Sequence, residues 1–282
     1  MIDLALRRQF FAQEIEAVAN LRTSSLVDAL AAIPRERFLR AGPWLVQGDL
    51  TGPRQTPDAD PQQVYHNYSV AIDPQRQLFN GNPSLIAGVI DSLRLNAGDR
   101  IAHIGAGLGY YSALIGHVVG PSGRVLAIEV DDTLAGEARA NVSSMPWIEV
   151  RAGNATTALA ESFDAILVNA GVTHPQDAWL DALAPGGRLV LPLTATMPTM
   201  GTIGKGVMAM FTKRPDGDFD GRVLTFVAIY SGIGLRDDAL NMQIGQALMR
   251  NPFPQLRRLR RDAHAQTADC WLHGGTFCLA TG

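Results

Sequence analysis

Short apolar runs alternate with amphipathic segments through the middle of the chain. The apolar runs lie at residues 101–104, 124–130, 147–152, 163–169 and 188–193. Helical patterns stand between them at residues 110–119, from Asp131 or Asp132 to about Ser144, and at 175–183. Strands with few polar positions, separated by helices, are typical of a parallel sheet that is covered on both faces. The pattern therefore predicts an α/β fold with a doubly wound, mostly parallel sheet.

The N-terminal part has a different pattern. Residues 3–20 carry an apolar stripe at helical spacing, and Ser24 or Ser25 can cap a second helix that runs to Ile33. Prolines and glycines recur through residues 34–64, which predicts a loop-rich passage over the edge of the sheet. We interpret these segments as a cover for the main domain.

The last third of the chain changes character again. Residues 206–213 and 222–230 flank the turn-rich stretch RPDGDFDG, which predicts a β-hairpin that adds antiparallel strands to the sheet. Residues 237–249 follow as a predicted helix, and the ending ADCWLHGGTFCLATG indicates a terminal strand pair or a strand with a turn.

The strongest local signal is a glycine-rich turn between a strand and a helix. Gly105, Gly107 and Gly109 follow the strand at 101–104, and the next strand ends in Glu129. Glycines let the backbone turn sharply and lie against a ligand, while a carboxylate at the neighbouring strand end can accept both hydroxyls of a ribose. The spacing Gly-x-Gly-x-Gly differs from the Gly-x-Gly-x-x-Gly of pyrophosphate sites, so it favours S-adenosylmethionine (SAM) over NAD or FAD.

Composition limits the range of partners. The chain has 282 residues, 46% of them hydrophobic and 18% charged, with a net charge of −3 and a pI near 6.1. This balance gives no overall attraction to nucleic acid or to an anionic membrane, and no apolar run is long enough to span a bilayer. Cys270 and Cys278 are the only cysteines, and no signal-like segment opens the chain, so we expect a cytoplasmic protein.

Several longer stretches resemble one enzyme family. They are IPRERF at 33–38, DSLRLNAGDRIAHIGAGLGYYSAL at 91–114, FDAILVNAG at 163–171 and GGRLVLP at 186–192. Over about residues 20–230, the chain resembles class I SAM-dependent methyltransferases and, more narrowly, protein-L-isoaspartate O-methyltransferases. The resemblance implies a Rossmann-like, seven-stranded sheet with an antiparallel C-terminal hairpin. The expected divisions are a cover at 1–64, the methyltransferase domain at 65–232 and a C-terminal extension at 233–282.

The resemblance also assigns a cofactor site. Gly105, Gly107 and Gly109 would hold the methionine part of SAM, Glu129 its ribose and Asn154 the edge of its adenine. The expected cofactor site further includes His103, Ala106, Tyr110, Val130, Ala155 and Asn169. Two positions depart from the family pattern: His103 replaces a carboxylate expected near the ammonium group of SAM, and Asn154 replaces an aspartate whose acceptor role an amide oxygen can keep.

The loop before the helix that begins at Pro83 is the candidate acceptor site. The family has Gln-Thr-Ile-Ser-Gln-Pro here, whereas this chain has QLFNGNP at 77–83, which is longer and lacks both hydroxyls. We expect Gln77, Asn80 and Asn82 to orient the acceptor as catalytic residues, and Phe79 with Asn80 to contact the substrate. Phe79 and Tyr110 would wall the cleft. Methyl transfer to an ionised carboxylate needs no general base, which fits the lack of an obvious one.

Three functions remain open from the sequence. The first is carboxyl O-methylation of an isoaspartyl or ordinary aspartyl side chain in a peptide or protein. The second is an RNA or small-molecule methyltransferase, because residues 116–132 also resemble tRNA adenine methyltransferases, although the acidic balance and the lack of a basic-aromatic stripe argue against nucleic acid. The third is a catalytically silent SAM or peptide binder.

Two features of the C-terminal extension are also open. The extension could serve as a substrate lid or as the surface of a homodimer. His264, Cys270, His273 and Cys278 offer sulfur and nitrogen ligands, but their separations match no zinc pattern, so the sequence predicts no metal.

Overall fold

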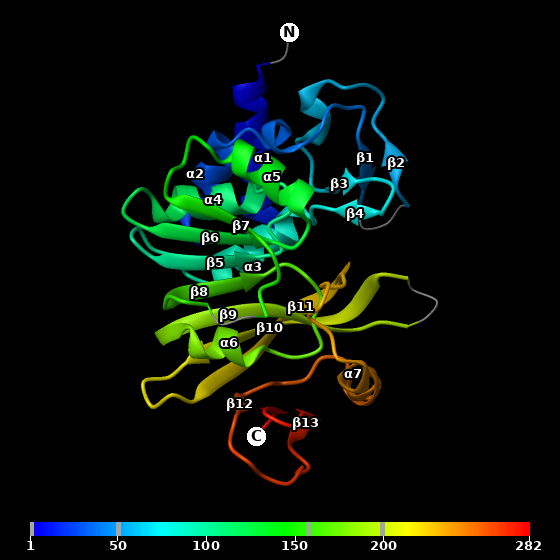
Figure 1. Ribbon diagram of the computed structural model, residues 1–282. Helices are drawn as coiled ribbons and strands as arrows, with labels where there is room; N and C mark the ends of the chain where they lie inside the picture. The colour runs from blue at the N-terminus through cyan, green and yellow to red at the C-terminus, as the bar shows by residue number, and fades with distance from the viewer. Residues whose placement is uncertain (1–2, 49–51, 157–158, 198–200) are drawn as a thin grey trace. The chain divides into compact units, whose positions relative to one another are not determined.

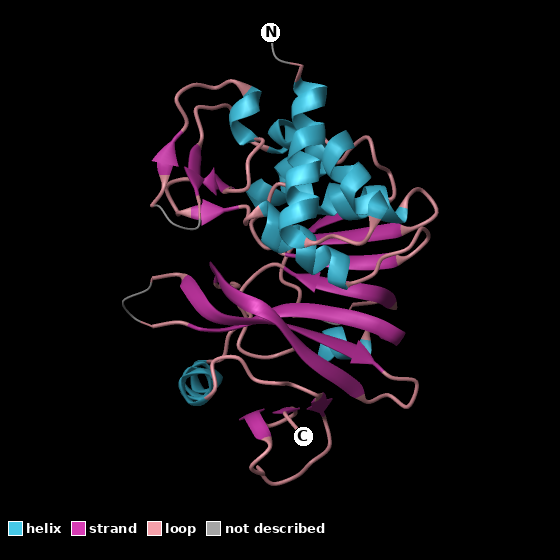
Figure 2. Ribbon diagram, turned by 180° about the vertical axis from the view of Figure 1, so that it is seen from behind, coloured by secondary structure: helices cyan, strands magenta, loops and turns pink. Residues whose placement is uncertain are grey.

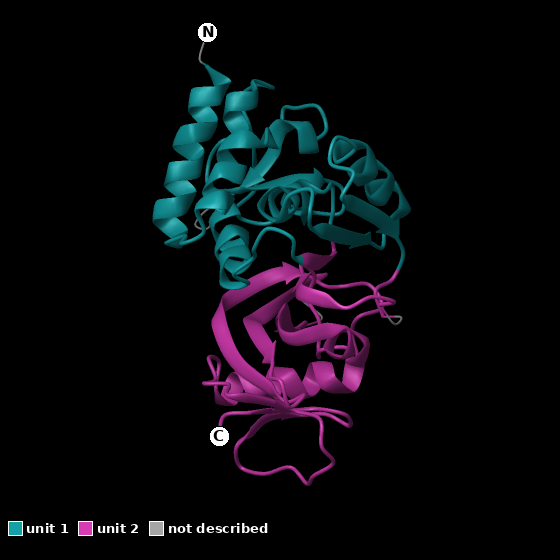
Figure 3. Cartoon of the chain, turned by 90° about the vertical axis from the view of Figure 1, so that its left-hand side faces the viewer, with its two compact units in different colours: residues 1–99, 106–153 teal, residues 100–105, 154–282 magenta. Residues whose placement is uncertain are grey.

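The computed structural model describes residues 3–48, 52–156, 159–197 and 201–282 of the chain. It forms two compact units, shown in different colours in Figure 3. Unit 1 consists of Met1–Asp99 and Ala106–Gly153, and unit 2 of Arg100–Gly105 and Asn154–Gly282. The chain therefore passes from one unit to the other three times, after Asp99, after Gly105 and after Gly153.

The described part of unit 1 contains five α-helices, which can be followed in Figure 2. They are α1 (Leu4–Ala19), α2 (Ser24–Ala32), α3 (Pro83–Ser92), α4 (Tyr110–Val119) and α5 (Asp132–Asn141). Helix α1 packs on α2 and α3, and α2 packs on α4. The apolar stripe of α1 turns Phe11 and Ile15 inward against Leu26 and Leu30 of α2, all of which are buried. Both predicted N-terminal helices are thus confirmed, although α2 begins after Thr23 and lacks the predicted serine cap.

Two parallel strands lie against α4 and α5 in the same unit. Strand β6 (Arg124–Glu129) pairs with β7 (Ile148–Ala152). Strand β6 is a nearly continuous apolar run, whereas β7 buries Ile148 and Val150 and alternates them with Glu149 and Arg151. The Trp147 indole donates to the carbonyl oxygen of Gly116 in α4 at 2.8 Å. Helix α4 therefore packs directly against this strand pair.

Residues 34–64 contain more regular structure than the sequence predicted. Short 3₁₀ helices span Arg35–Phe38 and Pro61–Val64. The small sheet has the order β2-β1-β3-β4, with β1 (Leu45–Gln47), β2 (Arg54–Gln55), β3 (Ser69–Asp73) and β4 (Leu78–Phe79). Strands of two or three residues are too short to give a period-2 pattern, so the sequence did not reveal β1 and β2. Residues 49–51 lie outside the described part.

A buried arginine organises this passage. The Arg35 side chain donates from Nη1 to the carbonyl oxygens of Val64 and His66 at 2.7 and 3.2 Å, and from Nη2 to that of Tyr68 at 2.8 Å. Its guanidinium lies over the Phe11 ring, 5.7 Å from the centroid. Arg35 thereby ties α1, the first 3₁₀ helix and residues 64–68 together.

Unit 2 is built on a long mixed sheet. Strands β5 (Arg100–Ile104), β8 (Phe163–Val168) and β9 (Leu183–Ala195) are parallel, and β10 (Ile203–Lys213) and β11 (Phe219–Tyr230) continue the sheet antiparallel. The order within this unit is β13-β14-β12-β11-β10-β9-β8-β5, and the long strands β9–β11 run side by side in Figure 1. The seven strands predicted for the methyltransferase fold are present as β5–β11.

The remaining elements of unit 2 differ in detail from the prediction. Helix α6 (Asp177–Asp181) is shorter than expected, because Leu183 already pairs with Phe163 and so begins β9 early. Helix α7 (Asp238–Arg250) and the terminal strands β13 (Cys270–His273) and β14 (Cys278–Ala280) are as predicted.

One strand of the extension was not predicted at all. The arginine-rich segment at residues 257–261 contains β12 (Arg258–Arg260), whose Leu259 is buried between Phe219 and Leu279. Among the described residues, no helix combines the length and apolar character that crossing a membrane requires. The three-part division at residues 64 and 232 stays a prediction.

Candidate active site

The glycine turn has the sharply turned backbone that its sequence predicts. In unit 1, Gly107 has φ +55°, and a Cβ there would lie 3.1 Å from Cδ1 of Ile72. In unit 2, Gly105 has φ +79°, and a Cβ would lie 3.1 Å from the carbonyl oxygen of Asn169. Both positions combine a left-handed φ with a close neighbour, so only glycine fits without strain. Ala106 is buried between them, and Gly109 precedes the first residue of α4.

Glu129 lies at the carboxyl end of β6 with its carboxylate directed at the turn. Its Oε2 accepts from the Gly107 backbone N–H at 2.7 Å, and its Oε1 accepts from the Asp131 N–H at 3.1 Å. Burial raises the pKa of Glu129, and these backbone donors oppose that shift. Each carboxylate oxygen has capacity for another hydrogen bond, so Glu129 can hold the turn and still accept from a hydroxyl. The next residue, Val130, is exposed.

An ion pair that we did not predict lies beside Glu129. Asp131 caps α5 by accepting from the N–H groups of Thr133 and Leu134, and its Oδ2 lies 2.5 Å from Nη1 of Arg76. The Leu134 N–H and the Arg76 guanidinium hold the pKa of Asp131 below its usual range. The pair fixes the loop after β3 to the start of α5. The capping position of Asp131 was visible in the sequence, but nothing marked Arg76 as its partner.

Two of the predicted catalytic residues make hydrogen bonds to nearby backbone groups that precede their loop. Gln77 is exposed, has φ +54°, and donates from Nε2 to the carbonyl oxygen of Pro74 at 3.0 Å. Asn80 accepts at Oδ1 from the Val70 N–H at 2.9 Å, while its own N–H donates to the Val70 carbonyl, also at 2.9 Å. Asn80 thus pins β4 to β3, and its role toward an acceptor stays a prediction.

Asn82 caps the helix that follows. Its Oδ1 accepts from the N–H groups of Ser84 and Leu85 at 3.0 and 3.3 Å, and its Nδ2 donates to the carbonyl oxygen of Asn67 at 3.3 Å. The predicted start of the helix at Pro83 is therefore confirmed, and the sequence analysis missed this capping function of Asn82. A catalytic role for Asn82 remains untested.

Aromatic side chains border this loop in unit 1. Phe79 is half-buried in β4, and the adjacent Leu78 packs on the cluster of Ile72, Leu108 and Leu134. Tyr111 donates from its hydroxyl to the carbonyl oxygen of Gly81 at 3.2 Å, and burial raises its pKa to about 12. The loop is therefore fastened to the first turn of α4.

Tyr110 lies in the interior of unit 1. Its ring packs edge-on against Phe38 and Tyr111, with centroids 5.6 and 5.2 Å apart, and burial raises its pKa. The side chain is 3% exposed. Its predicted roles in the cofactor site and in the cleft wall stay predictions.

In unit 2, His103 is fully buried in β5, opposite Leu167 of β8. Burial lowers its pKa to about 4, so the imidazole is neutral at pH 7. A neutral ring adds no positive charge to this strand, and it therefore does not repel a cationic ligand group as an imidazolium would. Compared with the carboxylate of the family pattern, His103 thus lacks the attraction for a cationic ligand group but does not repel it.

The buried imidazole predicts acid sensitivity of unit 2. Between about pH 6.5 and pH 4 the unfolded chain binds a proton at His103 that the folded chain excludes, so stability is lost as the pH falls. The full window is worth about 3 kcal/mol. His103→Leu should show a smaller loss of unfolding free energy between pH 7 and pH 4.5 in urea titrations than the wild type. His117→Leu, which alters an exposed histidine, should keep the wild-type loss, and an unchanged slope in His103→Leu would disprove the assignment.

The other predicted cofactor residues of unit 2 lie at strand ends. Asn169 follows β8, and its N–H donates to the carbonyl oxygen of Ile104 at 2.8 Å. Asn154 is exposed, accepts at Oδ1 from the Thr156 N–H at 3.1 Å, and donates from Nδ2 to the carbonyl oxygen of Ile233 at 3.4 Å. Ala155 is buried. The predicted convergence of these residues with Glu129 stays a prediction.

A segment after β11 crosses the end of β8, which the sequence did not reveal. The Gly171 N–H donates to the carbonyl oxygen of Tyr230 at 2.8 Å, and the Gly232 N–H donates to that of Gly171 at 2.9 Å. A Cβ on Gly234 would lie 2.3 Å from Nδ2 of Asn154. Residues 230–234 therefore lie against Asn154 and against Gly171, two positions after Asn169, and the family pattern gave no signal for this contact.

Comparison with known proteins identifies the family. The family model for protein-L-isoaspartate(D-aspartate) O-methyltransferase matches residues 53–229, which include the glycine turn, Glu129 and the loop at 77–83. The chain belongs to this family. The protein-L-isoaspartate O-methyltransferase of Methylorubrum populi is 30% identical over 240 residues, covering 83% of this chain and 99% of the relative. That of Methylorubrum extorquens is 29% identical over 231 residues, covering 79% of this chain and 89% of the relative. The predicted membership in the isoaspartate O-methyltransferase family is confirmed.

Solved structures of isoaspartate O-methyltransferases share the fold. One protein-L-isoaspartate O-methyltransferase superposes with a TM-score of 0.60 at 21% identity, covering 86% of this chain and 69% of its own. A Plasmodium falciparum protein designated protein-L-isoaspartate O-methyltransferase, in complex with S-adenosyl-L-homocysteine, also has a TM-score of 0.60 at 15% identity. It covers 79% of this chain and 97% of its own. The predicted Rossmann-like α/β fold is confirmed.

Proposed function

We propose that this isoaspartate O-methyltransferase family member transfers a methyl group from SAM to a side-chain carboxylate of a peptide or protein, with isoaspartate as the preferred acceptor. The observation that carries the proposal is the match to the family model over residues 53–229. Within that range, Glu129 is fixed against Gly107 at the end of β6. The matched range extends beyond the glycine turn and also includes residues 77–83, the candidate acceptor loop.

The residues present suit the cofactor. Gly107 carries no side chain that would obstruct a ligand at the turn, and Glu129 keeps acceptor capacity for ribose hydroxyls after bonding two backbone N–H groups. SAM supplies an electrophilic methyl group on a sulfonium. His103 is neutral and fully buried, so the α-ammonium group must find its acceptors elsewhere, for which backbone carbonyl groups of the turn are suited.

The chain has to position its acceptor rather than activate it. A carboxylate is ionised at neutral pH and attacks in line with the departing sulfur, so no general base is required. Orientation and exclusion of water are then the main contributions of the protein. Because Oδ1 of Asn80 already accepts from the Val70 N–H, its Nδ2 group is the part that can donate to an acceptor carboxylate.

A matched set of peptides tests the function. The protein, labelled SAM and peptides identical except for isoaspartate, aspartate or asparagine at one position would be incubated, and base-labile methyl esters would be counted. We expect labelling of the isoaspartyl peptide at least ~10-fold above the aspartyl peptide and none of the asparaginyl peptide. Equal or greater labelling of the aspartyl peptide would disprove the preference, and labelling of tRNA alone would disprove carboxyl methylation.

Calorimetry with SAM, together with the transfer assay, distinguishes an active methyltransferase from a protein that only binds SAM. Binding of SAM without transfer to any peptide would identify a silent relative, whereas no binding would remove the SAM-dependent function itself. The same titration defines the SAM concentration for the transfer assays, so a negative assay would not result from an unsaturated protein.

The loop allows a sharper test of positioning. Asn80→Asp keeps an oxygen that can accept from the Val70 N–H but replaces the donating NH₂ group with a second acceptor. We expect kcat/KM to fall by ~10- to 100-fold through repulsion of the acceptor carboxylate, with SAM affinity unchanged. Gln75→Glu adds the same charge at an exposed loop position and serves as the control. Equal kcat/KM for Asn80→Asp and Gln75→Glu would exclude Asn80 from positioning the acceptor.

Two further properties belong to the same proposal. Cys270 and Cys278 are not joined by a disulfide in the structure, which supports a reducing, cytoplasmic location. Homodimerisation through residues 233–282 is the alternative to their use as a substrate lid. Light scattering of the full chain and of a chain that ends at Gly232 distinguishes these roles. A dimer formed through residues 233–282 would give twice the chain mass for the full chain and a single chain mass after truncation, whereas a lid would give a single chain mass in both.

A further inference from the structure

Four potential metal ligands come together in the C-terminal extension, outside the matched family region. His264, Cys270, His273 and Cys278 each offer a ligand atom, and these atoms all lie within 4.8 Å of one another. The sequence predicted no metal because their separations, H-x5-C-x2-H-x4-C, match no common pattern. The fold supplies the proximity that the spacing did not reveal.

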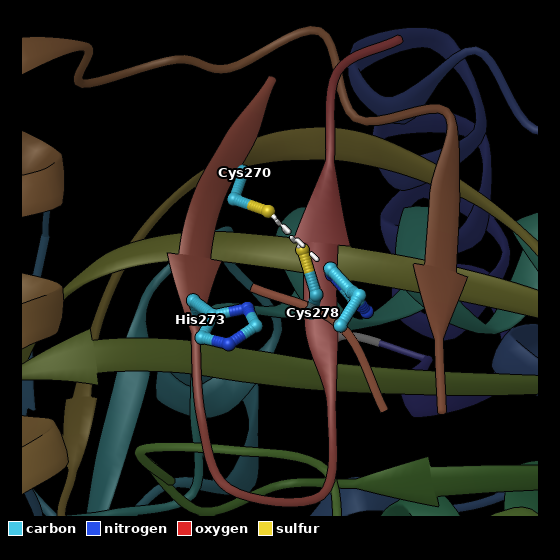
Figure 4. A group of neighbouring side chains, drawn as sticks. Cys270, His273 and Cys278 are labelled. Atoms are coloured by element: carbon cyan, nitrogen blue, oxygen red, sulfur yellow. Dashed lines mark hydrogen bonds between the residues drawn. The ribbon is translucent and has the colours of Figure 1, made fainter. Parts of the chain in front are cut away.

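The terminal hairpin accounts for three of the ligands. Strands β13 and β14 are antiparallel, with His273 paired to Cys278 and Cys270 paired to Ala280. Figure 4 shows the side chains of Cys270 and Cys278 directed at one another, with the His273 ring beside them. The two sulfurs are 2.7 Å apart. Because both sulfurs belong to the buried face of the hairpin, their proximity follows from the strand pairing.

The fourth ligand is the one side chain in its loop that turns inward. Residues 261–268 form no helix or strand and are otherwise exposed, but the His264 side chain is only 12% exposed. Its Nε2 lies 3.7 Å from Sγ of Cys270, and its Nδ1 lies 2.8 Å from the carbonyl oxygen of Asp262. A histidine that donates from Nδ1 to a carbonyl has its Nε2 lone pair free for a metal, which is the usual arrangement of a histidine ligand.

Two further features of the cluster are consistent with a bound metal ion. The Thr267 backbone N–H donates to Sγ of Cys270 at 3.4 Å, an arrangement that stabilises a thiolate. In the described part of the chain, Nδ1 of His273 is buried without a hydrogen-bond partner, and a bound cation would satisfy such a nitrogen.

We propose that His264, Cys270, His273 and Cys278 bind one structural zinc ion. Two sulfurs and two ring nitrogens are a tetrahedral donor set typical of Zn²⁺, and four protein ligands leave no position for a substrate. A tetrahedral site with Zn–S bonds of ~2.3 Å separates its sulfurs by ~3.8 Å, so small side-chain rotations from the present geometry suffice. The ion would connect the loop at 261–269 to β13 and β14. These two strands are short, so the zinc ion would stabilise their pairing.

Metal analysis of the full chain tests the site directly. Protein expressed in zinc-supplemented medium, with any polyhistidine tag removed, should contain ~1 zinc ion per chain after gel filtration. The wild-type chain loaded with Co²⁺ should show the visible absorption of a tetrahedral cobalt-thiolate site. Less than ~0.1 ion per chain, both as purified and after refilling with Zn²⁺ under reducing conditions, would overturn the proposal.

Variants identify the ligands without relying on activity. His264→Gln changes an irregular loop and Cys278→Ser changes one atom, and each should lower zinc content at least ~10-fold and abolish the cobalt-thiolate spectrum. His117→Gln alters an exposed histidine of α4 and should retain both. Full zinc content in both ligand variants would disprove the assignment.

The competing state is a disulfide between the two cysteines. Because the chain has no other cysteine, thiol titration is unambiguous. Zinc-bound protein should show little thiol reactivity when folded and two reactive thiols per chain after denaturation with a chelator. Denatured, unreduced protein without reactive thiols and without zinc would establish the disulfide and overturn the metal site.

Discussion

Glu129→Gln is expected to weaken SAM binding by at least ~100-fold while leaving the fold intact. One side-chain oxygen of the glutamine can still accept a backbone N–H, but its NH₂ group would face a second donor, Gly107 or Asp131. The variant would also lose the charge-assisted hydrogen bond that we propose Glu129 makes to the ribose, and such bonds contribute about 1.5–3 kcal/mol each. Two losses of this size correspond to the expected change in Kd.

Titration calorimetry with SAM measures the effect, and thermal unfolding checks the fold. Glu149→Gln on the neighbouring strand β7 is the matched control, because that carboxylate is half-exposed and pairs with Arg124 and Arg151 at the surface. Glu129→Asp keeps the charge on a shorter side chain and should recover part of the affinity. A Kd for Glu129→Gln within ~3-fold of the wild type would show that Glu129 only braces the Gly107 turn.

Local sequence patterns were sufficient for the central fold. Helix α4 begins and ends where predicted, and β6 and β8 differ from the predicted strands by one terminal residue. These elements are continuous apolar runs or helices that end at glycines, so their signal lies within a few neighbouring residues. Gly105 and Gly107 belong to the same class, because the steric need for glycine can be inferred from the strand–turn–helix context.

Features that depend on distant residues were not predicted. The hydrogen bonds of Asn80 with Val70 and the approach of Ile233 to Asn154 link segments whose pairing is set by tertiary structure. The proximity of the four potential metal ligands around Cys270 was not predicted for the same reason. Metal-binding sequence patterns describe spacing along the chain, whereas the distances between these side chains depend on strand register. From the sequence alone, an amide side chain in a loop is equally suited to donate to a substrate or to stabilise the loop. Only its contacts in the structure distinguish these two roles.

Arg35→Ala is expected to lower the unfolding free energy by about 3–5 kcal/mol, the largest stability effect we predict. The fully buried guanidinium donates to the carbonyl oxygens of Val64, His66 and Tyr68. Alanine would remove the donor to the buried carbonyls of Val64 and Tyr68, whereas the His66 carbonyl would still accept from the Tyr68 N–H. Arg37→Ala, two positions away and exposed, is the control and should change stability by less than ~0.5 kcal/mol. Urea unfolding measures both variants.

Arg35→Lys separates charge from geometry. Lysine keeps the positive charge, but a single ammonium cannot reproduce the fork that reaches three carbonyls along residues 64–68. We therefore expect a loss close to that of alanine, together with faster hydrogen exchange at residues 61–68. A lysine variant as stable as the wild type would mean that the charge over the Phe11 ring matters more than the hydrogen bonds. Because the loop leading to Asn80 and Asn82 follows directly from β3, loosening residues 64–68 should also lower turnover of the remaining folded protein.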